Sequence, residues 1–250
     1  MKLGIIGGNG VAATNLLNTL IEQRITRHGA FRDAHHPEII TWQATQAPSR
    51  SLFLEGRGES FVPQYVEVGK ILKSAGCTKL CMCCNTAHAM LETLQAEIGL
   101  PFINLIEIVV QNVKQTSFRK VGLLASDGCI KGNVYGKYFE KFPEIEIIYP
   151  EPEFQQMVTR GICNVKNSFR FANPDAPERP RHLWQLICSH LHELGAELIV
   201  LGCTDIAVDW DSSVFNALPV INSLEVLADT ISDEFLIEQQ GKGVFTNVKH

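Results

Sequence analysis

Short apolar runs alternate with longer amphipathic stretches along the whole 250-residue chain. This alternation is typical of βαβ units, in which crossover helices join parallel strands. The predicted strands are residues 2–7, 39–42, 79–84, 101–105, 120–125, 144–149 and 197–202. The predicted helices are 12–21, 66–75, 86–98, 181–194 and a C-terminal helix that follows residues 219–221. We therefore expect an α/β fold built on parallel sheets.

Two of the predicted helices have apolar side chains at a spacing that indicates one buried face. In the helix over residues 66–75 these side chains are Val66, Val68, Ile71 and Leu72. In the helix over residues 181–194 they are Leu183, Leu186, Ile187 and Leu191. We expect all of them to pack against the sheets.

Two short patterns occur twice in the chain. Residues 121–125 read Val-Gly-Leu-Leu-Ala and resemble residues 3–7, which read Leu-Gly-Ile-Ile-Gly. A predicted strand followed by Cys84, Asn85 and Thr86 resembles a predicted strand followed by Cys203 and Thr204. No linker rich in Pro, Gly and Ser separates the two halves. The sequence therefore predicts two similar α/β lobes that pack closely.

Each of these two cysteines follows a strand directly. Ligands of open α/β sheets bind at the carboxyl ends of the strands. With Asn85 or Thr86 as the N-cap of the next helix, the thiol of Cys84 lies at a helix N-terminus. That position lowers a thiol pKa and offers backbone N–H groups to a carboxylate. Cys203, followed by Thr204, is expected to repeat the arrangement.

Two thiols that face each other across a cleft have a specific use. One can remove a proton from one face of a carbon atom while the other delivers a proton to the opposite face. A single cysteine in such a position is more often a buried core residue. Because Cys84 and Cys203 occupy equivalent places in repeated halves, the pair indicates racemisation or epimerisation.

Composition excludes several other classes of protein. The net charge of −5 and the absence of a Lys or Arg run disfavour nucleic acid as a partner. No window is apolar enough for a membrane helix, and glycines interrupt the apolar run at the N-terminus, which disfavours a secretory signal. We expect a cytoplasmic protein whose eight cysteines are mostly buried thiols.

Metal and nucleotide sites are the two main alternatives. Cys81 and Cys84 form one Cys-x2-Cys pair, but no second pair completes a zinc site, and alternate residues of a strand point to opposite faces. The turn at residues 7–10 is neither Gly-x-Gly-x-x-Gly nor a P-loop. We expect no metal and no nucleotide.

Five segments carry a family resemblance. They are Gly-Ile-Ile-Gly-Gly-Asn-Gly at 4–10, Cys-Cys-Asn-Thr-Ala-His at 83–88, Val-Gly-Leu-Leu-Ala-Ser-Asp-Gly at 121–128, Leu-Gly-Cys-Thr-Asp at 201–205 and Pro-Val-Ile-Asn-Ser at 219–223. In this order they resemble the motifs of the aspartate/glutamate racemases, in the aspartate racemase branch. The resemblance spans residues 1 to about 235.

The resemblance implies two Rossmann-like or flavodoxin-like lobes related by a pseudo-twofold axis, with the active site in the cleft between them. It places residues 1–101 and 216–240 in the first lobe, residues 102–215 in the second, and residues 241–250 in a flexible tail. It also implies a homodimer that uses no pyridoxal phosphate or other cofactor.

The resemblance assigns roles to particular residues. Cys84 and Cys203 are the catalytic acid and base. Residues 48–51 are similar to the family's Pro-Asp-Arg-Thr, whose arginine binds a substrate carboxylate, and Lys166 lies where a lysine often binds the second one. The substrate-binding set is Gly8, Asn9, Arg50, Ser51, Asn85, Thr86, Lys166 and Thr204, and the supporting set is His88, Ser126 and Asp205. The two cations favour aspartate or glutamate as the substrate.

Several residues depart from the family pattern. They are Asn9, Val11, Ser49, Cys83, Asp205 and Asn222, where the family has Met, Pro, Asp, Pro, Glu and Asp. None removes a thiol, so the departures bear on the substrate more than on the reaction. The alternatives are a related isomerase of the maleate or hydantoin type and a catalytically silent amino-acid-binding protein. Prolines at 174, 177 and 180 further suggest that residues 173–181 act as a lid.

Overall fold

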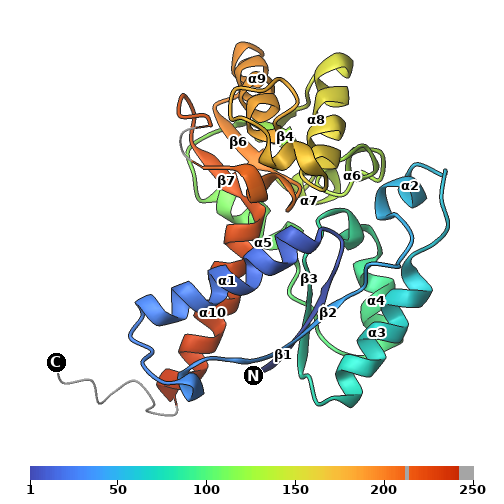
Figure 1. Ribbon diagram of the computed structural model, residues 1–250, viewed down its shortest axis with the longest axis vertical. Helices are drawn as coiled ribbons and strands as arrows, with labels where there is room; N and C mark the ends of the chain where they lie inside the picture. The colour runs from blue at the N-terminus through green and yellow to red at the C-terminus, as the bar shows by residue number, and fades with distance from the viewer. Residues whose placement is uncertain (212–213, 242–250) are drawn as a thin grey trace.

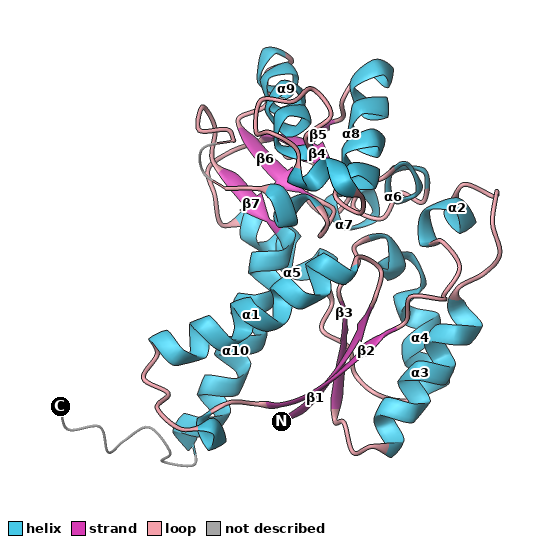
Figure 2. Ribbon diagram, in the orientation of Figure 1, coloured by secondary structure: helices cyan, strands magenta, loops and turns pink. Residues whose placement is uncertain are grey.

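Two parallel β-sheets, one in each half of the chain, organise the computed structural model, which describes residues 1–211 and 214–241. The first sheet has the order β2-β1-β3 and the second the order β5-β4-β6-β7. The strands are β1 (Lys2–Gly7), β2 (Glu38–Gln43), β3 (Lys79–Met82), β4 (Lys120–Leu124), β5 (Glu146–Ile148), β6 (Leu198–Leu201) and β7 (Val220–Asn222). Figure 2 shows the sheets as two separate groups of strands. The predicted α/β fold with two parallel sheets in two lobes is confirmed.

Helices cover both faces of each sheet. The α-helices are α1 (Val11–Arg27), α2 (Arg50–Leu54), α3 (Val62–Ser74), α4 (Leu91–Ile98), α5 (Leu105–Lys114), α6 (Asp127–Lys131), α7 (Gly136–Phe139), α8 (Pro152–Asn164), α9 (Pro180–Glu193) and α10 (Ser223–Gly241). Short 3₁₀ turns are η1 (Asp33–His35), η2 (Thr86–Met90), η3 (Ser168–Phe171) and η4 (Ile206–Asp209). Helices α3 and α4 pack on one face of the first sheet, and α8 and α9 lie on the outer side of the second (Figure 1).

One hydrophobic cluster joins the lobes. It contains Leu3 and Ile5 of β1 together with Leu123 of β4 and Val200 of β6, all of them buried. Helix α10 packs against α1 and α5 within this cluster. Because both lobes bury apolar surface in the same cluster, their relative position is fixed by packing as well as by hydrogen bonds.

The sheets repeat the same strand order around their central strands. In each sheet the strand that comes first in the sequence, β1 or β4, lies in the centre of this group of three. The strand that precedes a cysteine, β3 before Cys84 and β6 before Cys203, lies on the corresponding side of the central strand. Strand β7 extends the second sheet, although the predicted boundary groups residues 216–240 with the first lobe. The lobe boundaries stay a prediction, and residues 242–250 of the predicted tail lie outside the described part of the chain.

Some predicted elements differ from the structure. Residues 101–105 form only an isolated bridge between Leu80 and Phe102 before α5 begins. Residues 86–98 form η2 followed by α4 rather than one helix. Ile71 and Leu186 are each 41% exposed, because they lie to the side of the buried stripe of their helices. No helix among the described residues is long and apolar enough to span a membrane.

Candidate active site

The two cysteines singled out by the sequence lie in equivalent places. Cys84 lies two positions beyond the end of β3, and Cys203 lies two positions beyond the end of β6. Both side chains are half-buried. Each is followed by a 3₁₀ turn, η2 after Cys84 and η4 after Cys203. The structure therefore puts the same local architecture around both thiols.

The electrostatic setting of the thiols differs from the expected one. The α-helix N-terminus expected after Cys84 is a five-residue 3₁₀ turn, and the side chain of Asn85 does not cap it. Burial raises the pKa of the Cys203 thiol to about 12, and the neighbouring Asp205 carboxylate acts in the same direction. The prediction of a lowered pKa is therefore wrong for Cys203, which is a protonated thiol at neutral pH.

Hydrogen bonds between the lobes surround the cysteines. Thr204 Oγ1 donates to the carbonyl oxygen of Cys83 over 3.1 Å. Thr86 Oγ1 and Ser126 Oγ lie 2.9 Å apart and share a hydrogen bond. Tyr135 donates its hydroxyl to Asn85 Oδ1 over 2.7 Å. These contacts join the loop that carries Cys84 to the second lobe.

Several predicted substrate-binding side chains thus have protein partners. Asn85 Nδ2 also donates to Ser223 Oγ over 3.0 Å, and Ser51 Oγ accepts a hydrogen bond from the backbone N–H of Gly128 over 2.8 Å. Direct contact of Ser51, Asn85, Thr86 or Thr204 with a substrate stays a prediction. What the structure adds is that their side chains, with Ser126, hold the two lobes together.

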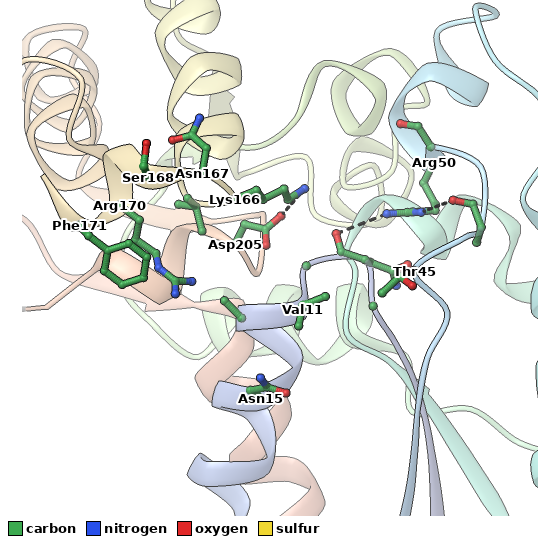
Figure 3. A pocket seen from close by; sticks show the side chains of 17 residues that line it. Val11, Asn15, Thr45, Arg50, Lys166, Asn167, Ser168, Arg170, Phe171 and Asp205 are labelled. Atoms are coloured by element: carbon green, nitrogen blue, oxygen red, sulfur yellow. Dashed lines mark hydrogen bonds and ion pairs between the residues drawn. The ribbon is translucent and has the colours of Figure 1, made fainter.

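A cavity of about 850 Å³ lies between the lobes (Figure 3). One wall of the cavity belongs to the first lobe and consists of Gly8, Asn9, Gly10, Val11, Ala12, Asn15, Thr45, Ala47, Ser49 and Arg50. The second lobe contributes Val165, Lys166, Asn167, Ser168, Arg170, Phe171 and Asp205. The cavity therefore brings together the predicted residues Gly8, Asn9, Arg50, Lys166 and Asp205.

Arg50 connects this cavity to Cys84. Its guanidinium donates to the carbonyl oxygens of Ala47, Pro48 and Asn9 over 3.3, 3.0 and 3.4 Å, and it lies close enough to Cys84 to interact with it electrostatically. Burial alone lowers the pKa of Arg50, but the neighbouring Cys84 and Tyr65 outweigh burial and raise it. The guanidinium of Arg50 therefore places a positive charge beside the side chain of Cys84.

Asp205 and Lys166 form an ion pair on the opposite wall, with 3.0 Å between Asp205 Oδ2 and Lys166 Nζ. Asp205 is only 4% exposed. Burial raises the pKa of the Asp205 carboxyl, and Lys166 opposes that rise. The carboxylate of Asp205 therefore neutralises much of the charge of Lys166.

Three buried polar atoms around the cavity lack a hydrogen-bond partner among the described residues. They are Asn9 Nδ2, Arg50 Nε and Asp205 Oδ1. Asn9 is held in place because Tyr65 donates its hydroxyl to Asn9 Oδ1. Buried polar groups are normally satisfied, so two donors and one acceptor without partners indicate a polar ligand. A carboxylate suits the two donors, and an ammonium group suits the carboxylate oxygen.

His88 lies outside this cavity. Its Nε2 accepts a hydrogen bond from the backbone N–H of Leu105 over 3.1 Å, so its Nδ1 donates to the carbonyl oxygen of Cys84 over 2.8 Å. Burial lowers the pKa of His88 to about 4. His88 is thus neutral at neutral pH and holds the backbone of Cys84, while its role as a supporting residue stays a prediction.

Some residues at the site have no clear local signature in the sequence. Tyr65 and Tyr135 are far from the motif residues Asn9 and Asn85 in the sequence and reach them only through tertiary packing.

The predicted lid at residues 173–181 does not line the cavity. Arg179 in this segment forms two hydrogen bonds of 2.7 Å to Asp209. The adjoining residues 165–171 line the cavity instead.

Within residues 1–211 and 214–241, no group of three or more His, Cys, Asp or Glu side chains is arranged to hold a metal ion. Cys81 and Cys83 are both fully buried, and burial raises the pKa of each thiol. Buried thiols of this kind are core residues rather than nucleophiles. That the chain uses no metal or cofactor stays a prediction.

Comparisons with known proteins identify a family for the chain. The family model described as Asp/Glu/Hydantoin racemase matches residues 5–231. The broad specificity amino-acid racemase RacX of Bacillus subtilis (strain 168) is 22% identical over 240 residues, which are 95% of this chain and 99% of RacX.

Solved structures share the two-lobe fold. The aspartate racemase of Picrophilus torridus has a TM-score of 0.77 and 26% identity, with 94% of each chain covered. The glutamate racemase of Francisella tularensis subsp. tularensis SCHU S4, in complex with D-glutamate, has a TM-score of 0.64 over 95% of this chain and 81% of that chain. At 15% identity this second likeness shows the fold alone.

The family match covers most of the chain, and its relatives are named as amino-acid racemases. The resemblance predicted from the cysteine motifs is confirmed, as is the prediction of an enzyme of the amino-acid racemase class. The chain belongs to the Asp/Glu/hydantoin racemase family.

Proposed function

We propose that the chain is a cofactor-independent racemase of an acidic amino acid, aspartate or glutamate, and that Cys84 and Cys203 exchange the α-proton on opposite faces. The observation that carries the proposal is the equivalence of the two thiols. Each lies two positions beyond the corresponding strand of a repeated sheet, and the hydrogen bonds between the lobes join the loops that carry them.

The proton transfers balance between the two sulfur atoms. A thiolate at one cysteine takes the α-proton and becomes a thiol, while the thiol of the other gives its proton to the opposite face and becomes a thiolate. The high pKa of Cys203 suits the thiol role in the free enzyme. Cys84, which has the guanidinium of Arg50 as a neighbour, then takes the thiolate role in this proposal.

The cavity supports an amino acid with two carboxylates. Among the described residues that line it are the cations Arg50, Lys166 and Arg170 and the single carboxylate of Asp205. Arg50 Nε and Asn9 Nδ2 are the free donors for one carboxylate of the substrate, and Asp205 Oδ1 is the free acceptor for its ammonium group. Arg170 and Lys166 are then the cations nearest to a side-chain carboxylate.

Chiral chromatography of a panel of L- and D-amino acids incubated with the protein tests the substrate. We expect turnover of aspartate or glutamate, and a fall of at least about 100-fold in kcat/KM for Arg50→Leu, because a buried charged hydrogen bond to the carboxylate is lost. Turnover confined to neutral or basic amino acids would contradict the acidic substrate. Maleate and a hydantoin are incubated in parallel, and turnover of one of these compounds without turnover of any amino acid would favour a related isomerase.

The homodimer and the cytoplasmic location belong to the same proposal. Support for the dimer is the family resemblance, and support for the location is the ordinary composition of the chain and its many unpaired cysteines. Sedimentation at micromolar concentration tests the dimer, and a monomer at that concentration would contradict it.

A further inference from the structure

Helix α2, which begins at Arg50, contacts helix α6 of the other lobe (Figure 1). Ser51 Oγ accepts a hydrogen bond from the backbone N–H of Gly128 over 2.8 Å and donates to Glu55 Oε1 over 2.8 Å. Lys131 Nζ donates to the carbonyl oxygen of Glu55 over 2.6 Å. Ser51, Glu55, Gly128 and Lys131 are named here the α2–α6 clamp.

The clamp leaves no room between the two helices. A Cβ atom added to Gly128 would lie 2.4 Å from Ser51 Cα and 2.6 Å from the carbonyl oxygen of Ser51. Such distances to backbone atoms cannot be relieved by a change of rotamer. Only glycine at position 128 allows this approach, so the contact between the lobes depends on the absence of a side chain there.

Little else fixes α2. None of its residues is fully buried, and Leu52 is exposed. Phe53 and Leu54 are half-buried, with Phe53 in an edge contact with Phe61. A five-residue helix is too short to be stable by itself, so its position depends on these few side chains and on the clamp.

Arg50 is the residue of α2 that faces the cavity. It precedes Ser51 directly, and its guanidinium lies between the carbonyl oxygens of the first lobe and the side chain of Cys84. A shift of α2 away from α6 therefore moves the guanidinium relative to Cys84. Contacts between α2 and the second lobe therefore influence the position of Arg50, the residue of the first lobe that is expected to bind a carboxylate.

We propose that Ser51 and Lys131 are positioning residues that act through Arg50, so that the α2–α6 clamp sets the position of the carboxylate-binding guanidinium. In this role the hydroxyl of Ser51 does not bind the substrate. The inference rests on the proposed function because it takes Arg50 as the residue that binds a substrate carboxylate.

Steady-state kinetics of Ser51→Ala and Lys131→Met tests the proposal. We expect KM to rise by about tenfold with kcat within about twofold, because a misplaced Arg50 weakens binding of the substrate and of the transition state alike. In an Arg50→Lys background, Ser51→Ala is expected to change KM by less than about twofold, since the residue through which it acts is already altered. An undiminished tenfold effect in that background would overturn the proposal.

Matched controls separate the clamp from general effects of substitution. Ser60→Ala removes an exposed hydroxyl whose partner is the backbone N–H of Val62, and Lys70→Met removes an exposed ammonium group on α3. Both are expected to leave KM and kcat unchanged within about twofold. Circular dichroism and thermal unfolding of every variant show whether it is folded.

Hydrogen exchange tests the clamp without any activity. In Ser51→Ala and Gly128→Ala, amides of residues 50–58 are expected to exchange at least about tenfold faster than in the parent protein, whereas the two controls leave them unchanged. If the protein racemises no amino acid but exchange accelerates, the clamp stands and the proposed function fails. If exchange in both clamp variants equals that of the parent protein, the clamp fails whatever the activity.

Discussion

At the scale of single residues, Asp205 influences the charges of two other groups at the site, Lys166 and Cys203. Its carboxylate pairs with Lys166 over 3.0 Å, and it lies two positions after Cys203. The pKa of the Cys203 thiol is raised first by burial and then by this carboxylate, while Lys166 opposes the rise. Asp205 therefore has two effects, neutralising Lys166 and keeping Cys203 protonated.

Replacing Asp205 by Asn is expected to lower the pKa of Cys203. The substitution removes a negative neighbour and leaves the ammonium of Lys166 without its partner, and both changes favour the thiolate. Alkylation of Cys203 by iodoacetamide, followed by peptide mass spectrometry across a pH series from about 7 to 10, is expected to be at least about tenfold faster in the variant.

Asp175→Asn, a substitution at an exposed residue, is the matched control for this measurement. It should give the alkylation profile of the parent protein. An Asp205→Asn profile that coincides with that of the parent protein would contradict the role assigned to Asp205.

At the scale of elements, His88 connects η2 to the start of α5. Its two ring nitrogens bond the carbonyl oxygen of Cys84 and the backbone N–H of Leu105. Burial lowers its pKa to about 4, whereas an unfolded chain protonates histidine near its ordinary value of 6.5. The unfolded state therefore binds the proton first as pH falls.

Stability is expected to depend on pH through this histidine. The contribution of neutral His88 is complete above pH 6.5 and is lost as pH falls toward about 4, an effect on the order of 3 kcal/mol. Urea unfolding at several pH values checks it. His88→Gln should flatten this part of the profile, whereas His192→Gln on the exposed side of α9 should not; equal slopes in all three proteins would refute the assignment.

The packing of α8 against α9 gives a second prediction at this scale. A Cβ atom at Gly161 would lie 2.4 Å from the ring of the fully buried Trp184. Helix propensity alone favours Gly161→Ala by about 1 kcal/mol, but overpacking costs about 1–3 kcal/mol, so we expect net destabilisation.

A double-mutant cycle with Trp184→Phe isolates the steric effect at Gly161. The smaller ring removes the atoms in conflict, so Gly161→Ala in that background should be neutral or stabilising by urea unfolding. Destabilisation of the same size in both backgrounds would show that the conflict is not with Trp184.

The sequence located most strands and missed some helices. Strand β1 was predicted at its observed bounds, because its apolar run is followed at once by glycines. Helix α5 was missed although its buried side chains have helical spacing and Asn104 caps it, since the preceding apolar residues were interpreted as a strand. Strand β3 ends at Met82 rather than at Cys84, and the Cys83 carbonyl oxygen beyond it accepts a hydrogen bond from Thr204 of the other lobe, a contact that no local pattern could indicate.

At the scale of the whole molecule, the site is a property of the contact between lobes. Sequence motifs identified Arg50, Lys166 and Asp205, which the structure brings to one cavity. The same motifs could not show that Ser51 and Thr204 bond groups 77 and 121 positions away in the chain. These hydrogen-bond partners depend on how the lobes pack against each other. From the motifs alone, Ser51 and Thr204 could be interpreted only as residues that contact the substrate.

The shared hydrophobic cluster and the hydrogen bonds between the lobes hold the loops of the two cysteines in one site. Each lobe supplies one cysteine at the end of an equivalent strand, and Arg50 and Asp205 place opposite charges beside Cys84 and Cys203. In the proposed mechanism each lobe supplies one of the two proton-transfer groups. The proposed racemisation therefore needs both thiols together.

Exchange of the α-proton in D₂O, followed by NMR with L- and D-aspartate and L- and D-glutamate, tests this claim most directly, with Cys84→Ala and Cys203→Ala as the variants. We expect the parent protein to exchange the α-proton of both enantiomers of one of these acids, and either substitution to abolish the exchange. Exchange that persists in either variant, or no exchange with any amino acid despite measurable binding, would contradict the two-thiol account.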